Sequence, residues 1–386
     1  MIYIRRAGLA AFPIAFLFIL AGCGDVFRPV ATPITKPGGD PQFLRLAIAV
    51  NNNNGNVGTT TQVNVAGDTN VSTQTVGAGP VHAGFLGIGG TRLYVANKSD
   101  DTISSYTPIA GDLPTSLSLP AGSAPVFVHS TQTDAMFVAN SGTATVGVIS
   151  PTLNILTGQI PVGANPVALA ETPDGHKLYC VNNGSNTVTV ISTVDATVTG
   201  TVAVGSSPVW AAISADGATL FVLNQGTGTI SVVDTATDTV TGSLAVGSSP
   251  NFLLFDRHLA RIYVTNTGSN TVSIFKADVS PPTLLATVGV GTAPTSVTAL
   301  ADGSRAYVAN SGSGTVSVIN ASSNTVSRTI SVGQTPISID SSSDSSKVFV
   351  ANRDSTSVSD IRTSDETVVA TFTTGSPRPV FLTIAQ

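Results

Sequence analysis

YVTNTGSNTVSIF, from Tyr263 to Phe275, is a short apolar run followed by a polar turn and a second run in which apolar residues alternate. Six other stretches repeat this pattern, and they begin at Tyr94, Phe137, Tyr179, Phe221, Tyr307 and Phe349. The asparagine in the fourth place falls at Asn97, Asn140, Asn182, Asn224, Asn266, Asn310 and Asn352, in steps of 43, 42, 42, 42, 44 and 42 residues. A period in the low forties is typical of one blade of a β-propeller.

Each repeat contains four candidate strands. Between Pro166 and Gly205 they read PVALAET, KLYCVN, TVTVIS and TVTGTVAVG, and all are rich in Val, Ile, Thr and other strand-forming residues. Turn sequences such as Asp174-Gly175 and Asn183–Asn186 separate them. The pattern predicts an all-β chain of four-stranded antiparallel blades, with helix nearly absent because no segment keeps a helical period.

Packing explains why the sequence repeats. A four-stranded sheet with two apolar faces buries both only when it is stacked between copies of itself, so every copy is under the same constraints. We expect the repeated asparagine to end its strand, to bond the hairpin backbone and to tolerate a left-handed conformation there.

A second marker, G-x-x-P, counts the blades. It occurs at Gly77–Pro80, Gly122–Pro125, Gly163–Pro166, Gly205–Pro208, Gly247–Pro250, Gly291–Pro294 and Gly333–Pro336, with a variant one residue longer at Gly375–Pro379. We interpret the glycine as permitting a tight passage between blades, and the proline as opening the next strand at a point where no ladder donor is needed.

The two ends of the repeat array predict how the ring closes. The array begins with LRLAIAVNNNN, TTTQVNV and NVSTQTVG, which supply second, third and fourth strands, and it ends with a lone first strand, PVFLTIAQ. The C-terminal strand is therefore expected to complete the N-terminal blade and to remove the open edges. This gives eight blades; a ring of seven remains the alternative if LAIAVN is not a true blade strand.

Composition limits the possible partners. The chain has 386 residues, of which 42% are hydrophobic and only 10% charged, with 17 Lys plus Arg and a formal net charge of -5. It can bury a large core, but it offers no basic stripe for phosphates. No nucleic acid is expected as a partner.

The first residues look like an export signal. Arg5 and Arg6 precede an apolar run that ends in LAGC, Leu20 to Cys23. This ending resembles the bacterial lipoprotein signal, which implies cleavage before Cys23, lipidation of that residue and attachment to a membrane in the cell envelope. An uncleaved anchor or ordinary secretion is the alternative. By the same resemblance, Gly24 favours the outer membrane.

Three segments follow from this interpretation. Residues 1–22 form the signal peptide, and residues 23–42 contain the lipidated Cys23 and a tether with Pro29, Pro33, Pro37 and Pro41. Residues 43–386 form the propeller domain.

The motifs YVTN at Tyr263, YVAN at Tyr94 and Tyr307, and FVAN at Phe137 and Phe349 resemble the YVTN β-propeller repeats of bacterial envelope and archaeal surface-layer proteins. The resemblance covers about residues 44–386 and implies a fold rather than an activity. Members of this family are usually seven-bladed, so a count of eight departs from the pattern.

The residue two positions after each proline forms the most variable inner column. Its members are His82, Phe127, Ala168, Trp210, Phe252, Ser296, Ser338 and Phe381. Aromatic residues on one arc and small residues on the other predict an asymmetric ligand site at the channel mouth. The alternative is that the aromatic residues only fill the interfaces between blades.

Two further channel candidates stand four residues after a proline, His129 and Asp340. Together with His82 they are the only candidates for an acid-base or metal set, and we predict neither a metal nor a cofactor. His176 and His258 lie in polar turns and are interpreted as solvated. Cys180 is expected to be a buried thiol, because Cys23 would be lipidated.

Three functional hypotheses remain open. The first is a non-catalytic envelope lipoprotein that binds a protein, peptide or glycan through its loops or channel mouth. The second is an enzyme that resembles lactonase-type propellers and acts as a hydrolase or lyase in the channel. The third is a structural surface-layer component, which the Ser/Thr/Asn-rich, weakly charged composition favours. The sequence does not decide whether the protein is an enzyme, although no catalytic set is predicted.

Overall fold

The computed structural model describes residues 46–86, 92–108, 112–131, 135–375 and 378–385. The chain divides into two units, Met1–Gln42 and Phe43–Gln386, and the described residues all belong to the second. The predicted signal peptide, Cys23 and the tether lie outside the described residues. Within the described part of the chain, no helix has the length and apolar character needed to cross a membrane.

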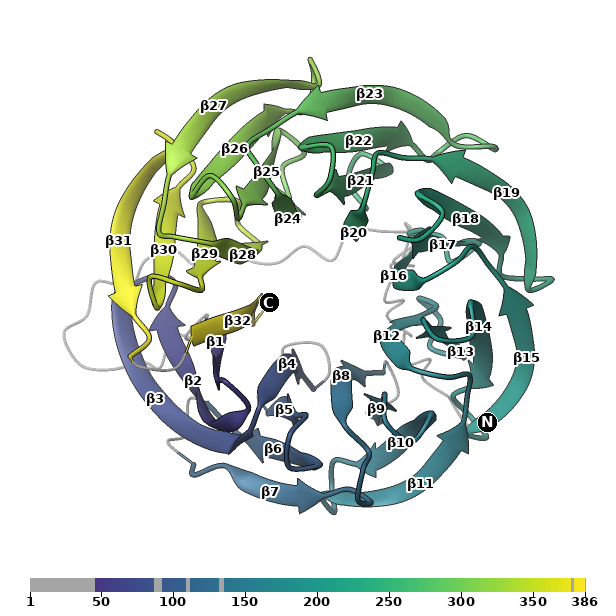
Figure 1. Ribbon diagram of the computed structural model, residues 1–386. Coiled ribbons are helices and arrows are strands. Elements are labelled where there is room, and N and C mark those ends of the chain that lie inside the picture. Colours follow the sequence, from purple (N-terminus) through teal and green to yellow (C-terminus); the bar gives the residue numbers. More distant parts are fainter. Residues whose placement is uncertain (1–45, 87–91, 109–111, 132–134, 376–377, 386) are drawn as a thin grey trace, which may run out of the picture. The chain divides into compact units, whose positions relative to one another are not determined.

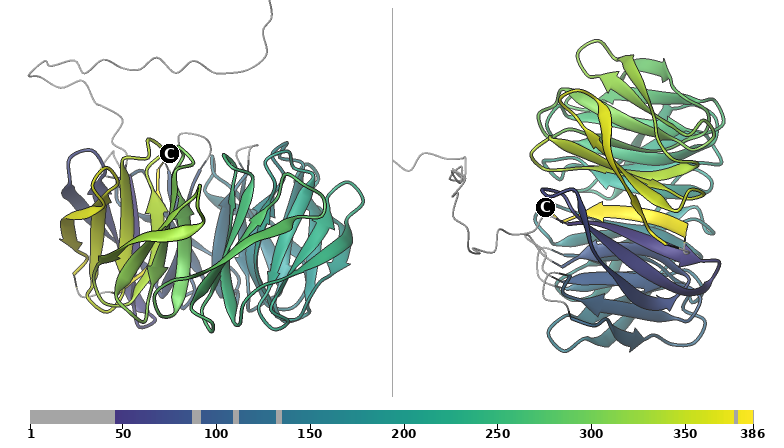
Figure 2. Two further views of the ribbon diagram at one scale, coloured as in Figure 1. Left: turned by 90° about the horizontal axis from the view of Figure 1, so that it is seen from above. Right: turned by 90° about the vertical axis from the view of Figure 1, so that its left-hand side faces the viewer.

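The described residues form 32 strands in eight separate four-stranded antiparallel sheets, arranged as blades around a central channel (Figure 1). In the side views of Figure 2 the strands run between the two faces of the ring. The prediction of an all-β propeller with eight blades is confirmed, and the seven-bladed alternative is wrong.

The four strands of a blade are ordered from the channel outwards. The first strands are β32 (Arg378–Ile384), β4 (Pro80–Phe85), β8 (Pro125–Ser130), β12 (Pro166–Glu171), β16 (Pro208–Ile213), β20 (Pro250–Asp256), β24 (Pro294–Ala299) and β28 (Pro336–Ser341). The second strands are β1 (Leu46–Asn53), β5 (Leu93–Asn97), β9 (Met136–Asn140), β13 (Lys177–Asn182), β17 (Thr219–Asn224), β21 (Arg261–Asn266), β25 (Arg305–Asn310) and β29 (Lys347–Asn352).

The outer half of each blade follows in the same order. The third strands are β2 (Asn56–Asn64), β6 (Thr102–Tyr106), β10 (Thr145–Ser150), β14 (Thr187–Ser192), β18 (Thr229–Asp234), β22 (Thr271–Lys276), β26 (Thr315–Asn320) and β30 (Ser357–Arg362). The fourth strands are β3 (Thr69–Ala78), β7 (Thr115–Ser118), β11 (Ile155–Pro161), β15 (Thr197–Ala203), β19 (Thr239–Ala245), β23 (Thr283–Gly289), β27 (Thr325–Ser331) and β31 (Thr367–Thr373). We number the blades from 1 to 8, beginning with the blade that contains β32.

Blade 1 contains the closure of the ring. Its strand order is β3-β2-β1-β32, so the C-terminal strand completes the N-terminal blade as predicted. Asn51 in β1 pairs with Pro379 in β32, which is the same pairing that joins Asn97 to Pro80 in blade 2. Asn51 is therefore the eighth copy of the repeated asparagine, and LAIAVN is a true blade strand.

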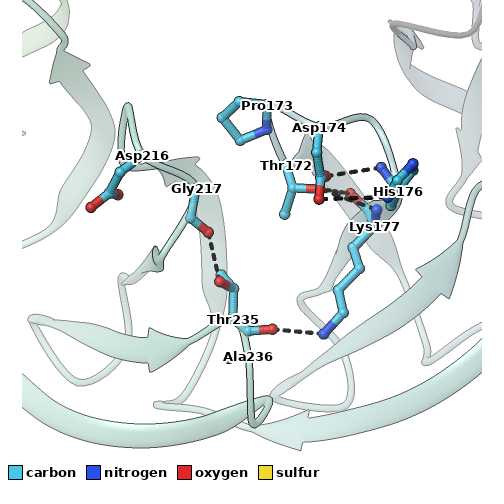
Figure 3. Close-up of a pocket in the computed structure, with 9 residues that line it drawn as sticks. All are labelled: Thr172, Pro173, Asp174, His176, Lys177, Asp216, Gly217, Thr235 and Ala236. Atoms are coloured by element: carbon cyan, nitrogen blue, oxygen red, sulfur yellow. Dashed lines mark hydrogen bonds and ion pairs between the residues drawn. The ribbon is translucent and has the colours of Figure 1, made fainter.

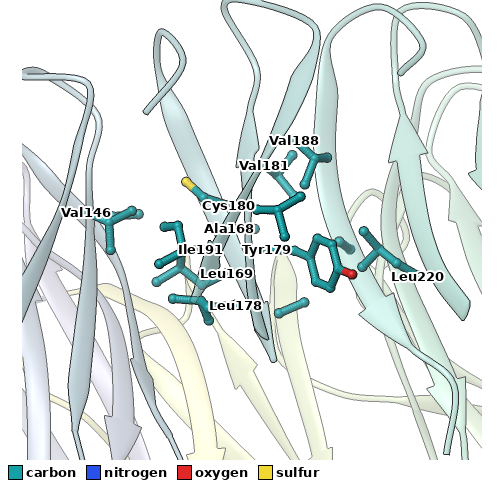
Figure 4. Close-up of a cluster of buried hydrophobic side chains, with 14 of the residues drawn as sticks. Val146, Ala168, Leu169, Leu178, Tyr179, Cys180, Val181, Val188, Ile191 and Leu220 are labelled. Carbon is teal, nitrogen blue, oxygen red and sulfur yellow. The ribbon is translucent and has the colours of Figure 1, made fainter. Parts of the chain in front are cut away.

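The core lies between adjacent blades. In β13, Tyr179 is buried on the side of blade 5, where Figure 4 places it towards Leu220, while Val146 of blade 3 lies on the opposite side. Because both faces of each sheet are covered, the second strands are buried along almost their whole length. Cys180 is a fully buried free thiol, and this burial raises its pKa.

The seven predicted asparagines end their strands, as expected, but their side chains do not make the predicted contacts. All of them are fully buried. The Nδ2 atom of Asn310 donates to Thr315 Oγ1 at 3.2 Å and to Ser317 Oγ at 3.0 Å, so the side chain ties the second strand to hydroxyls of the third strand. The expectation of bonds to the hairpin backbone and of a left-handed conformation is wrong, because Asn310 still pairs with Thr315 as the last residue of the ladder, its φ is not positive, and its side chain bonds to hydroxyls.

The glycine of G-x-x-P is needed for space. A Cβ atom on Gly291 would lie 2.7 Å from Asn310 Cγ and 2.5 Å from Ser313 Oγ. Equivalent clashes with the asparagine occur at Gly77, Gly163, Gly205, Gly247 and Gly333. The left-handed residue is instead the one immediately before the proline, such as Ala293 with a φ of 51°. Gly122 and Gly375 differ, since their φ values are positive and the space around them is open.

A cationic side chain links many neighbouring blades, and sequence reasoning missed it. It stands five residues before the repeated asparagine, which we call the latch position. From there Lys177 donates to Thr235 O at 2.6 Å and Asp238 Oδ2 at 2.8 Å in the next blade. Arg305 donates in the same way to Thr363 O at 2.7 Å and Glu366 Oε1 at 2.9 Å.

Two more cations at the latch position also reach the next blade. Arg261 donates to Ala321 O at 2.5 Å and to Asn324 Oδ1 at 3.0 Å. Lys347 of blade 8 pairs with Asp68 of blade 1, and this latch therefore spans the closure of the ring. A sparsely charged chain thus places several of its cations at the seams between blades.

We expect Gly291→Ala to lower the free energy of unfolding by about 1–3 kcal/mol, because the added methyl group overlaps the asparagine side chain. Gly289→Ala is the matched control, since a Cβ atom there meets nothing within 4 Å; it should be neutral or stabilise by up to about 1 kcal/mol. Urea unfolding of both variants measures the contrast. Equal effects at the two positions would contradict the steric explanation.

Candidate functional site

The eight first strands line the channel, and they bring five rings of the predicted inner column into mutual contact. The His82 ring stacks on Phe127 with centroids 3.9 Å apart and lies 4.3 Å from Phe381. Phe127 meets Trp210 edge to face at 5.6 Å, and Trp210 lies 4.8 Å from Phe252. We call these five residues the aromatic arc.

The contact between Phe127 and Trp210 shows that the rings reach into the channel. These residues belong to blades 3 and 5, which are separated by all of blade 4. They can meet only on the channel side of blade 4, where Ala168 supplies just a methyl group at the equivalent position. The rings also pack against the interblade cores, in agreement with the alternative expectation, whereas the ligand site at the channel mouth stays a prediction.

The rest of the inner column is small. Ser296 of blade 7 and Ser338 of blade 8 have exposed fractions of 6% and 8%, and they close the circle between Phe252 and Phe381. The column is therefore asymmetric, as predicted, with rings on blades 1, 2, 3, 5 and 6 and hydroxyls on blades 7 and 8. Such a surface offers apolar contact on one side and hydrogen bonding on the other.

His82 is neutral at physiological pH. Burial among the rings, together with the nearby His129, lowers its pKa to about 3. The backbone N–H of Val128 donates to His82 Nδ1 at 3.4 Å, which leaves the ring proton on Nε2. His82 therefore contributes to the arc as an uncharged ring.

His129 lies beside a carboxylate that the sequence did not single out. Its Nε2 atom is 3.4 Å from Glu171 Oε2, and the side chains are 27% and 5% exposed. Glu171 is five residues after its proline, whereas His129 is four after its own. Comparing residues at equal distances from each proline therefore did not reveal this pair. A histidine beside a carboxylate is the type of pair that acts as an acid or a base in enzymes.

Asp340 does not join the histidines. Its Oδ1 accepts the N–H of Ser341 at 2.9 Å, and its Oδ2 accepts the N–H of Ile384 at 3.1 Å. Burial raises its pKa to about 6, against the opposing effect of these hydrogen bonds. Ser338 Oγ accepts the N–H of Leu382 at 3.1 Å in the same way, so blade 8 holds the closing strand β32 through two side chains.

The described residues contain no group of three His, Cys, Asp or Glu side chains placed to hold a metal ion. The hypothetical set of His82, His129 and Asp340 does not converge, because Asp340 is bonded to β32 and the histidines lie on blades 2 and 3.

A cleft of about 440 Å³ between blades 4 and 5 was not predicted (Figure 3). It contains His176, whose side chain is 68% exposed and whose Nδ1 lies 3.6 Å from Asp174 Oδ2. The interpretation of His176 as a solvated turn residue is confirmed; His258, with a side chain 56% exposed, is in the same position. Lys177 borders the cleft but is held by its latch contacts.

No protein-family model matches the chain, and no curated protein matches it. Many solved structures do. A dihydro-heme d1 dehydrogenase in complex with its ligand is 11% identical, with 92% of this chain and 78% of that chain covered and a TM-score of 0.75. AztD from Citrobacter koseri is 12% identical, with coverages of 88% and 98% and a TM-score of 0.66.

A putative 6-phosphogluconolactonase from Bacteroides fragilis is 16% identical, with 90% of this chain and 99% of that chain covered and a TM-score of 0.62. Similar structures thus include enzymes as well as AztD. At these identities the similarity shows the β-propeller fold and does not select an activity.

The pKa of His82 predicts that stability falls as the pH is lowered from 6.5 towards 3, because the unfolded chain binds a proton that the folded chain refuses. Asp340 acts in the opposite direction between pH 6 and 3.8, since its raised pKa favours proton uptake by the folded state. His82→Phe isolates the histidine contribution. The stability advantage of the wild type over this variant should shrink on acidification by at most about 1.4 kcal/mol per pH unit.

Urea unfolding of both proteins at pH 7 and pH 4.5 measures this difference. An advantage that is the same at both pH values would mean that His82 titrates normally in the folded protein.

Proposed function

We propose that the protein is a non-catalytic, lipid-anchored cell-envelope propeller of the YVTN type, which binds a protein, peptide or glycan partner through the aromatic arc. The observation that supports this function is the unbroken series of ring contacts from Phe381 to Phe252, opposite the hydroxyls of Ser296 and Ser338. Four of the five rings are only partly buried. Aromatic surface that remains accessible in a channel is suited to stacking on sugar rings or apolar side chains.

The five residues of the aromatic arc carry no charge, which limits the kind of partner that they can bind. His82 is neutral, and the other members of the arc are hydrocarbon or indole rings. An uncharged partner segment would lose little solvation on entering. A nucleic acid would find no phosphate-binding cations there.

Trp210 is the only tryptophan of the chain, so its fluorescence reports on the arc alone. We expect mature protein to retain a partner from the native envelope, and the eluted partner to change this fluorescence on titration. Trp210→Ala/Phe252→Ala should lose the partner by removing the centre of one side of the arc. Leu284→Ala, at an exposed position of the outer strand β23, is the control and should retain it.

The double variant also loses packing against the cores of blades 5 to 7, so its folding is checked by circular dichroism and thermal unfolding. If it unfolds, Trp210→Leu replaces it, because leucine keeps hydrocarbon in place and removes the indole. Retention of the partner by a folded variant would move the binding surface to the outer loops.

The proposed lipid anchor has a separate test. Cys23→Ser should abolish incorporation of labelled palmitate, because the thiol proposed to carry the lipid is gone. Wild-type protein that takes up no label but stays in the membrane fraction would favour an uncleaved anchor.

A hydrolase acting in the channel is the second candidate, and the observation that favours it is the pairing of His129 with Glu171 beside the arc. Turnover of a panel of lactones that is lost in His129→Gln, with normal folding, would support this candidate. Equal activity of the variant and the wild type would exclude the pair from the reaction.

A further inference from the structure

The seam between blades 5 and 6 lacks its latch. The latch position of blade 5 is Thr219, where blades 4, 6, 7 and 8 have Lys177, Arg261, Arg305 and Lys347. In the three seams where a cation meets a backbone carbonyl, the acceptors are Thr235, Ala321 and Thr363. Ala277 occupies the corresponding place in blade 6, because its N–H makes the same interstrand bond as theirs. The receiving half of the latch is thus present without its donor.

A cleft of about 380 Å³ lies at this position, bordered by Thr219 on one side and by Ala277 to Ser280 on the other. Val232 and Val279 contribute hydrocarbon to its walls. No described Lys or Arg side chain lines it. The cleft therefore combines an aliphatic wall with the carbonyl of Ala277. The equivalent carbonyls of three other seams accept a hydrogen bond from a cation.

The polar rim of the cleft is acidic. Hydrogen bonds from Ser214 and Ala218 lower the pKa of Asp216, and hydrogen bonds from Thr237 lower that of Asp234, so both are ionised at neutral pH. Asp278 adds a third carboxylate to the lining of the cleft. Its Oδ1 lies 3.6 Å from Nζ of Lys276, a residue that does not line the cleft. A cation that enters is attracted, and it replaces no resident side chain.

The seam between blades 3 and 4 provides a contrast. There the latch position is Ala135, and the left-handed turn residue that would receive it is Ala196. The backbone carbonyl of Thr193 remains there, because the Thr193 N–H makes the same interstrand bond as that of Ala277, but neither side chain of that latch is polar. Of these two seams, the one between blades 5 and 6 keeps polar side chains around the vacant latch position.

We propose that this cleft binds a lysine or arginine side chain of a partner protein, whose aliphatic stem lies along Val279 and whose charged end reaches Ala277 O and the carboxylates of Asp216 and Asp234. The partner would thus complete the seam as Arg261 and Arg305 complete theirs. This site is separate from the aromatic arc, and its test does not depend on the proposed function.

The probe is N-acetyl-arginine methylamide, and N-acetyl-citrulline methylamide is its neutral isostere. With ¹³C-labelled Ala and Val methyl groups, we expect the arginine probe to shift the signals of Ala277, Val232 and Val279 in a saturable way, and the citrulline probe to leave them unchanged. Added salt should weaken the effect, because the attraction is electrostatic. Equal shifts with both probes, or no shift at millimolar concentration, would overturn the proposal.

Thr219→Arg supplies the missing latch from within the chain. We expect it to abolish the shifts caused by the arginine probe and to raise the melting temperature by about 1–2 °C. Thr219→Val, which keeps the size but adds no charge, should still bind the probe. Undiminished probe binding in a folded Thr219→Arg protein would show that the cleft is not the site.

Discussion

The ring depends on a buried amide at the end of the second strand of each blade. A primary amide away from water must find partners, and here it finds hydroxyls on the third strand, such as Thr187 and Thr189 for Asn182. The same amide fills the space beside the connection that enters from the preceding blade. At most seams only a glycine of that connection fits next to the amide. The asparagine, the hydroxyl residue and the glycine therefore recur together in the sequence because they are parts of one arrangement. It joins the second strand of a blade to its third strand and to the connection that leads into its first strand.

Charge is used sparingly and mainly where blades meet. With only 17 Lys plus Arg in the chain, the cations at the latch position form a large share of the positive charge that the fold uses in defined contacts. Lys177, Arg261 and Arg305 each donate to a carbonyl and to a polar side chain of the next blade, and these contacts require a defined geometry between neighbouring sheets. Hydrophobic contact alone is not directional and would set this geometry less sharply.

Much of the architecture could be predicted, because repeats reveal positions that every blade needs. The eighth copy of the repeated asparagine, Asn51, was hidden because Ile48 replaces the aromatic residue before it, and its hydroxyl partners Thr59 and Thr61 follow a longer hairpin.

The candidate site was harder to predict from the sequence. The inner column was found by counting from each proline, but the contact between Phe127 and Trp210 depends on Ala168 lying between them. The pair His129 and Glu171 joins different columns of neighbouring blades, which spacing does not reveal.

The position of β32 gives the protein a direction of assembly. A chain that leaves a ribosome or crosses a membrane with its amino end first delivers β1, β2 and β3 at the start, and β1 then has an unpaired inner edge until about three hundred further residues have followed. During this interval the edge could pair with another chain. Folding chaperones would be needed most during this interval, and once β32 has docked, the ends of the domain hold each other and local fraying at either end is suppressed.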